Sequence, residues 1–193
     1  MFVEDNTLLC VDNEDINSDG TFTFPEDIVA IGNYAFSNCT NLTALKIPDS
    51  VFAICTGAFL NCKNLKSIFI PDSIHYIGYL AFDGCENLKS AKGVYKAFNP
   101  GMTCLGYQFK VNKWSQNVRE IGIRKCGYHY CTNLFEIFNF YHRTLDRDFV
   151  IYSCKTGYRT KKSDTSQCVT NKIKPIKQLT KKEVFKILNG EEI

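Results

Sequence analysis

Apolar and polar positions recur every twenty-three residues between Phe24 and Gly93. Written as three rows, this segment reads FPEDIVAIGNYAFSNCTNLTALK, IPDSVFAICTGAFLNCKNLKSIF and IPDSIHYIGYLAFDGCENLKSAK. A proline, an isoleucine, an Ala-Phe pair, a cysteine and an Asn-Leu pair align in all three rows. A fixed period of this length indicates a solenoid, in which each coil buries its apolar face against its neighbours.

Each row predicts a short strand and a compact turn. The segments LTALKI, beginning at Leu42, and LKSIFI, beginning at Leu65, match the pattern L-x-x-L-x-L, in which alternate side chains point inward. The third copy, LKSAKG from Leu88, is weaker. After each row's proline, a second apolar pair and the Ala-Phe and Cys positions also turn inward. Because about three repeats are the minimum for such a stack, we expect its ends to be capped.

Residues 1–23 suit the N-terminal cap, because they combine a short apolar run with the polar, turn-rich stretch DNEDINSDG. The same region satisfies the calcium-loop pattern D-x-[DN]-x-[DN]-G, followed by five residues and Glu, through Asp15, Asn17, Asp19 and Glu26. An EF-hand loop lies between two helices, whereas the residues TFTFP here are β-like. A capping turn is therefore the first interpretation and a calcium site the second.

Aromatic residues on the outer face of the solenoid are candidate partner contacts. If the strand faces alternate, Phe52 and His75 occupy one outward position on successive coils. Tyr76 occupies the next position, and Phe69 an outward position of the other strand. Clustered exposed aromatic residues mark protein contacts, so we predict protein binding at these four residues. The alternative is that Phe52 and Phe69 pack under a loop or against a second domain.

The period is lost after Gly93, which predicts a solenoid domain over residues 1–93 and a small α+β domain over residues 94–193. Strands are expected over residues 94–98, 106–111, 128–131, 148–154 and 167–173. An apolar segment over residues 133–141 predicts a buried helix. Thr180 and Glu183 form a capping box that opens a final helix ending near Gly190.

The formal net charge of +3 divides unequally along the chain. Residues 1–93 carry 5 Lys and Arg against 12 Asp and Glu, a net charge of −7, and residues 94–193 carry 18 against 8, a net charge of +10. A basic half attracts an anionic partner, such as nucleic acid or an acidic protein surface. The anion-binding candidates are Lys161, Lys162, Lys172, Lys174, Lys177, Lys181 and Lys182. The alternative is a basic surface without such a partner, because no nucleic-acid-binding motif is recognised.

The chain has ten cysteines, no apolar run of membrane-spanning length and no N-terminal secretory pattern. Three cysteines recur at one position of the repeat, where a solenoid needs a small buried residue, so we predict that they are reduced. These features favour the cytoplasm. No cofactor is expected, because no catalytic motif is recognised.

Cys126, His129 and Cys131 bring two thiols and an imidazole, the usual ligands of zinc, within six residues. Structural zinc sites contain paired ligands, and on a strand Cys126 faces away from the other two residues. A fourth ligand has to come from Cys104, Cys154 or Cys168. Reduced core cysteines beside a hydrogen-bonded histidine are therefore the preferred interpretation, and zinc is the alternative.

The rows IPDSVFAICTGAFLNCKNLKSI and IPDSIHYIGYLAFDGCENLKS resemble BspA-type leucine-rich repeats in their I-P-D-S, A-F and C-x-N-L signatures. This resemblance implies a repeat fold and a binding role. Many relatives are long surface adhesion proteins, and short intracellular forms occur in bacterial and phage genomes. The segments YKAF, MTCLGYQF and CGYHYC, with a helix ending in FNFY, resemble a phage and bacterial domain of unknown function that is often joined to such repeats.

A looser resemblance, to ADP-ribosyltransferase folds, rests on an early Tyr-Lys strand, a Gly-Tyr-His strand and a buried helix. It implies a nucleotide pocket lined by Lys96 and His129, beside Cys131, although no catalytic glutamate motif follows. The first hypothesis is a non-enzymatic protein-interaction protein, including a phage-type inhibitor of a host protein. The alternatives are a nucleotide-dependent modifying enzyme and nucleic-acid binding by residues 94–193.

Overall fold

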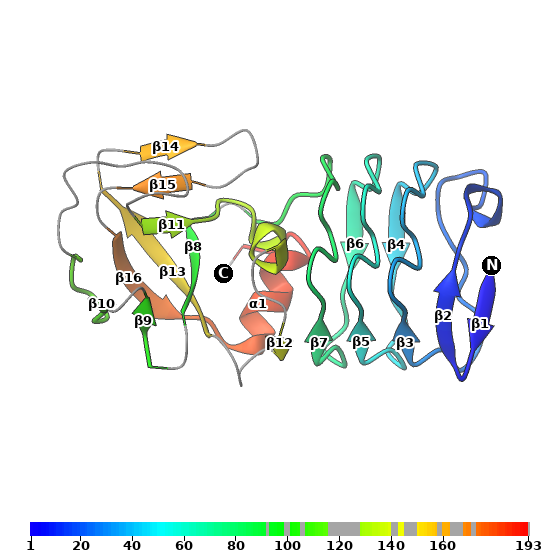
Figure 1. The fold of residues 1–193 in the computed structure, drawn as a ribbon, viewed down its shortest axis with the longest axis horizontal. Coiled ribbons are helices and arrows are strands. Elements are labelled where there is room, and N and C mark those ends of the chain that lie inside the picture. Colours follow the sequence, from blue (N-terminus) through cyan, green and yellow to red (C-terminus); the bar gives the residue numbers. More distant parts are fainter. Residues whose placement is uncertain are drawn as a thin grey trace.

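In the computed structural model, the twenty-three-residue rows stack as parallel strands in register (Figure 1). One ladder joins β3 (Ala30–Ile31), β5 (Ala53–Ile54) and β7 (Tyr76–Ile77). A second parallel pair joins β4 (Ala44–Lys46) to β6 (Ser67–Phe69). The first two rows thus have the predicted strand on the LTALKI and LKSIFI segments, whereas the weaker third copy has a bend at Ala91.

The structure describes residues 1–91, 93–98, 101–104, 107–115, 128–139, 143–144, 150–157, 160–162, 168–170 and 173–192. This part of the chain is strand-rich with one α-helix, and it contains no helix long and apolar enough to cross a membrane. At the start, β1 (Phe2–Glu4) and β2 (Thr7–Cys10) form an antiparallel hairpin, and β2 pairs in parallel with β3. A short 3-10 turn, η1 (Asn13–Asp15), follows.

The aligned Ala-Phe positions form a column of aromatic rings inside the rows. The centroids of the Phe36 and Phe59 rings are 5.1 Å apart, and those of Phe59 and Phe82 are 5.4 Å apart. All three side chains are buried. Full burial of such a side chain contributes about 1.5–3 kcal/mol, so each row adds a similar increment to the core.

Hydrogen bonds from the aligned C-x-N positions tie each row to the one before it. Each of three thiols donates to a backbone carbonyl at 3.0 to 3.2 Å; the pairs are Cys39 with Val11, Cys62 with Phe36 and Cys85 with Phe59. The Asn87 side chain likewise donates to the Lys63 carbonyl at 2.8 Å. The eight cysteines whose side chains the structure describes are all free thiols. Cysteine recurs here because it is small enough for the core and still carries a donor.

Residues 94–193 add three small sheets and the helix α1 (Lys181–Leu188), with antiparallel pairing in each sheet (Figure 1). The sheets are β8 (Tyr95–Phe98) with β13 (Val150–Thr156) and β16 (Ile173–Gln178); β11 (Tyr128–Tyr130) with β15 (Cys168–Thr170) and β14 (Thr160–Lys162); and β9 (Thr103–Cys104) with β10 (Tyr107–Gln108). The predicted capping box opens α1, with the Thr180 hydroxyl accepting from the Glu183 N–H and the Glu183 carboxylate accepting from the Thr180 N–H.

Three elements of this half differ from their prediction, and one is the strand expected over residues 106–111, of which β10 (Tyr107–Gln108) is strand and residues 109–111 are not. Within the described residues, the helix expected over residues 133–141 is a 3-10 helix, η2 (Leu134–Asn139), and its apolar side chains are buried as expected. The strand expected over residues 167–173 is instead divided between β15 and β16. The strand β16 continues through Pro175, which lies opposite Cys154 where the register with β13 shifts. A break in register of this kind accommodates a proline that has no N–H to donate.

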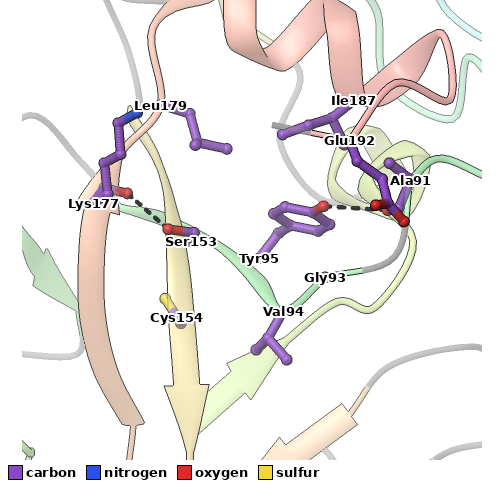
Figure 2. A pocket seen from close by; sticks show the side chains of 10 residues that line it. All are labelled: Ala91, Gly93, Val94, Tyr95, Ser153, Cys154, Lys177, Leu179, Ile187 and Glu192. Atoms are coloured by element: carbon purple, nitrogen blue, oxygen red, sulfur yellow. Dashed lines mark hydrogen bonds between the residues drawn. The ribbon is translucent and has the colours of Figure 1, made fainter.

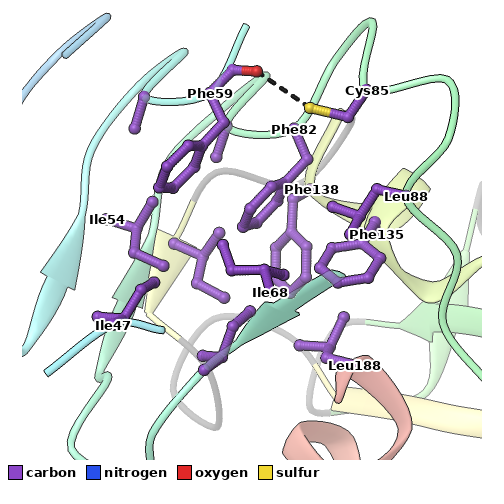
Figure 3. Packing of buried hydrophobic residues seen from close by; sticks show 14 of the residues in the cluster. Ile47, Ile54, Phe59, Ile68, Phe82, Cys85, Leu88, Phe135, Phe138 and Leu188 are labelled. Carbon is purple, nitrogen blue, oxygen red and sulfur yellow. Dashed lines mark hydrogen bonds between the residues drawn. The ribbon is translucent and has the colours of Figure 1, made fainter. Parts of the chain in front are cut away.

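The hydrophobic core runs without interruption from the rows into the residues after Gly93 (Figure 3). The Phe82 ring of the third row packs against Phe135 and Phe138 of η2, with centroid distances of 4.9 and 6.4 Å. The Leu80 N–H donates to the Phe138 carbonyl at 3.1 Å. The two-residue strand β12 (Arg143–Thr144) pairs antiparallel with β7. Segments of the second half therefore occupy the place of a fourth row.

Candidate interaction surfaces

Three of the four aromatic residues predicted to bind a partner lie together at the start of β5 and β7. The Phe52 side chain is 50% exposed and His75 is also exposed, whereas Tyr76 is half-buried. The backbone joins them, because the His75 N–H donates to the Phe52 carbonyl at 2.8 Å. Tyr76 also lies beside Ala53 in the ladder, so that the exposed aromatic surface spans two rows.

Phe69, the fourth residue, lies in β6 and so belongs to the other parallel sheet. It is 44% exposed. The IPDS turn separates it along the chain from His75, so the structure divides the predicted surface into two places. Phe52 and Phe69 are thus not fully buried, and whether they bind a partner stays a prediction.

A groove of about 380 Å³ crosses the outer face of β4 and β6. Its lining comes from positions separated by the repeat length, since Thr21, Ala44 and Ser67 are aligned residues of successive rows. The full lining is Thr21, Phe22, Ala44, Leu45, Lys46, Ser67, Ile68, Phe69 and Asn189. Sequence reasoning identified only Phe69 of this set; the column of small residues at the Ala44 position is the signal that marks the groove.

A cavity of about 480 Å³ lies between the third row, α1 and the sheet of β8, β13 and β16 (Figure 2). Its lining residues are Ala91, Gly93, Val94, Tyr95, Ser153, Cys154, Lys177, Leu179, Ile187 and Glu192. The Tyr95 hydroxyl, on one wall, donates to the Ala91 carbonyl at 3.1 Å. Burial raises the pKa of the Cys154 thiol to about 12, so this thiol is protonated at neutral pH and is a poor nucleophile.

The predicted nucleotide pocket at Lys96, His129 and Cys131 has two of its residues inside the core. Tyr95 and Cys131 bridge the strands through two backbone hydrogen bonds of 2.8 Å, which brings Cys131 close to Lys96. Lys96 is 4% exposed, and its Nζ lies 5.3 Å from the centroid of the Phe98 ring. Burial raises the pKa of the Cys131 thiol. His129 lies in β11 with its side chain outside the described part, so a pocket there stays a prediction.

Within the described residues, no group of three or more His, Cys, Asp or Glu side chains is arranged to hold a metal ion. Cys126 and the His129 side chain fall outside those residues, so the zinc hypothesis stays a prediction. In the predicted calcium loop, the Asp15 carboxylate accepts from the Asp12 N–H and contacts the N-terminal amine. The Asp19 carboxylate accepts from the N–H and hydroxyl of Thr21.

The other two residues of the predicted calcium loop give no support to an ion site. Asn17 donates from its amide nitrogen to the hydroxyls of Thr21 and Thr23 at 3.0 and 3.3 Å, and Glu26 is exposed. These are the hydrogen bonds of a turn that ends before the first row, which is the first of the two interpretations of this segment.

The predicted anion-binding lysines are spread over several elements. Lys174 and Lys177 lie in β16, Lys181 and Lys182 in α1, and Lys161 and Lys162 in β14 with side chains outside the described part. Lys172 lies outside the described residues altogether. Lys177 forms an ion pair with Glu183. Across the sheet from Lys174 lies Lys155, a cation that the prediction omitted.

Comparison with known families identifies both halves by their sequence. Residues 17–97 match the family described as BspA type leucine-rich repeat region, in six copies. The chain carries a BspA-type leucine-rich repeat region. Residues 92–187 match a domain of unknown function, DUF7666. The family count of six copies differs from the three rows of twenty-three residues, and the division of the chain at residue 93 stays a prediction. No curated protein and no solved structure matches the chain.

Proposed function

We propose that this BspA-type repeat protein is a non-enzymatic interaction protein whose repeat region binds another protein. The observation that carries the proposal is the exposure of Phe52, at 50%, next to β5 in the middle of a regular ladder in which the neighbouring apolar side chains are buried. Exposed aromatic side chains held on rigid backbone are typical anchors of protein interfaces. The leucine-rich repeat family fits the same role.

In this proposal, residues 1–93 form a three-coil solenoid with its N-terminal cap, and residues 94–193 form a second, basic domain that holds a further protein or an anionic partner. The free thiols of the described cysteines support a reducing compartment such as the cytoplasm. Blocking a host or rival protein is the narrower form of the proposal, and it rests on the phage and bacterial resemblance of the two halves.

Affinity capture with the full-length chain tests the proposal. Tagged wild-type protein and the variants Phe52→Ala and His75→Ala are exposed to a lysate of the native host, and retained proteins are identified by mass spectrometry. We expect a specific protein on the wild type that is reduced at least tenfold on Phe52→Ala. The matched control is Phe2→Ala, because Phe2 is 56% exposed on β1, outside the three rows. Equal capture by wild type, Phe52→Ala and His75→Ala would contradict the proposed surface.

A further inference from the structure

In the repeat region, lysines and carboxylates lie in different segments of each row. The strand segments, which we define as the aligned residues 40–47, 63–70 and 86–93, contain every lysine of residues 1–93. These lysines are Lys46, Lys63, Lys66, Lys89 and Lys92. The same segments contain one carboxylate, Glu86, and the other eleven Asp and Glu of residues 1–93 lie elsewhere. A half with a net charge of −7 therefore has a basic stripe along the segments that form β4 and β6.

The stripe overlaps the groove on β4 and β6 at Lys46. Lys46 lines the groove and is the register partner of Phe69, so a cation and an exposed aromatic ring lie side by side on one face. Lys66, next to the groove residue Ser67, is also exposed. The floor between these side chains is formed by small residues such as Ala44, which leave the strands accessible.

Carboxylates lie along one side of the stripe and at its first end. Asp49 and Asp72 are exposed in the IPDS turns that follow the strand segments. At the first row's end of the groove, Asp19 lies beside Thr21, whose N–H and hydroxyl donate to its carboxylate at 2.9 and 2.6 Å. The basic surface is therefore only one strand segment wide and ends at an acidic residue.

We infer that this groove binds a short, extended, acidic segment of the partner protein. The inference rests on the proposed function and specifies the chemistry of its partner. Strands in a sheet lie about 4.8 Å apart, so three aligned positions span about 10 Å, the length of about three extended residues. A carboxylate of such a segment pairs with Lys46, and an adjacent apolar side chain packs on Phe69.

The narrow stripe favours an acidic peptide over nucleic acid. A nucleic acid strand carries a charge at every phosphate and extends past the groove, where it meets Asp19, Asp49 and Asp72. A three-residue acidic segment keeps its charge within the stripe. The complementary charge also raises the rate of association, because the surrounding acidic surface directs anions to this one stripe.

Fluorescence anisotropy with the full chain at low salt tests the inference. The probes are a labelled octapeptide of alternating glutamate and leucine, the same peptide with lysine in place of glutamate, and a labelled octamer of thymidine. We expect the acidic peptide to bind at least tenfold more tightly than either other probe. Lys46→Glu is expected to weaken that binding at least tenfold, Lys46→Gln by a smaller factor, and the control Lys155→Glu by less than twofold.

Two results would overturn the groove assignment. The first is that the acidic peptide does not bind, or that Lys46→Glu leaves its affinity unchanged. The second is that the thymidine octamer binds as tightly as the acidic peptide. Either result leaves the proposed function standing if Phe52→Ala still abolishes capture of the partner. The far-ultraviolet circular dichroism spectrum of each variant shows that the fold is retained, which is expected because Lys46 is exposed.

Discussion

The side chain of Asn189 binds both backbone groups of Ile70, a residue 119 positions earlier in the chain. Its amide oxygen accepts from the Ile70 N–H at 2.8 Å, and its amide nitrogen donates to the Ile70 carbonyl at 3.1 Å. Ile70 follows β6, which is the last strand of this ladder within the described residues. The amide at the end of α1 therefore supplies the donor and acceptor that a neighbouring peptide bond supplies between the other rows.

Replacing Asn189 with alanine is expected to destabilise the whole chain by about 1–3 kcal/mol, because it leaves two partly buried backbone groups without partners. Asn189→Asp keeps an acceptor for the Ile70 N–H but places a second carboxylate oxygen against the Ile70 carbonyl, so we expect a loss at least as large. Urea unfolding followed by circular dichroism measures both changes. Lys182→Ala on the exposed face of α1 is the control, and an Asn189→Ala midpoint equal to that control would disprove the role of this contact.

The shared core predicts that both halves unfold together. Phe138 is fully buried against Phe82, so Phe138→Ala is expected to cost about 3–5 kcal/mol. Trp114 is the single tryptophan of the chain and lies in the second half, so its fluorescence follows that half. We expect Phe36→Ala, deep in the first row, to shift the fluorescence transition as well as the circular dichroism transition. A fluorescence midpoint that does not move would indicate two independent units.

The aligned thiols are expected to resist alkylation in the folded protein. Burial raises the pKa of Cys39 to about 12, and hydrogen bonding with Cys85, followed by burial, raises that of Cys62, so both thiols are protonated at neutral pH. Cys10, by contrast, is exposed. Treatment with iodoacetamide followed by peptide mass spectrometry should show modification of Cys10 well before Cys39 or Cys62. In concentrated urea all three should react at similar rates.

The start of α1 predicts a pH dependence of stability. The Lys177 amine, with the Thr180 N–H as a second donor, lowers the pKa of Glu183 to about 2 from an ordinary value of 4.5. A carboxyl whose pKa is lower in the folded state stabilises the fold above about pH 4.5 and loses that effect as the pH falls toward about 2. The stability difference between wild type and Glu183→Gln should therefore shrink across this range in urea titrations. A constant difference would show that Glu183 acts through packing alone.

The sequence predicts the rows well because each structural feature recurs at a fixed spacing. Cysteine and phenylalanine positions that align in the sequence also form columns in the structure, as with Phe36 and Phe59. The C-x-N-L signature of the rows occurs a fourth time in the sequence, from Cys131 to Leu134. It lies 46 residues after Cys85, and its asparagine donates to the Leu88 carbonyl at 2.8 Å. The local pattern predicts the end of a strand and the start of a buried helix at these residues.

Local sequence patterns do not predict contacts between residues far apart in the chain, such as the one that covers the end of β6. Asn189 lies at the end of a helix with an ordinary capping pattern, and nothing in its neighbours points to Ile70. The sequence also does not predict that Phe69 and Phe52 lie apart. The path of the chain at the IPDS turn decides which outward positions share a face. The lysines of the basic stripe can be found in the aligned rows, but the net charge of −7 for residues 1–93 does not indicate them.

The direction of the strands reverses at both ends of the parallel ladder, with β1 antiparallel to β2 and β12 antiparallel to β7. Within the described residues, a second molecule therefore meets an antiparallel strand at each end of this ladder and cannot continue it in parallel register. Repeats that bury their faces only against one another carry a risk of head-to-tail polymerisation into filaments, and short antiparallel ends remove it. Along this ladder the described residues thus form a stack of fixed length, and we expect a partner to approach its sides.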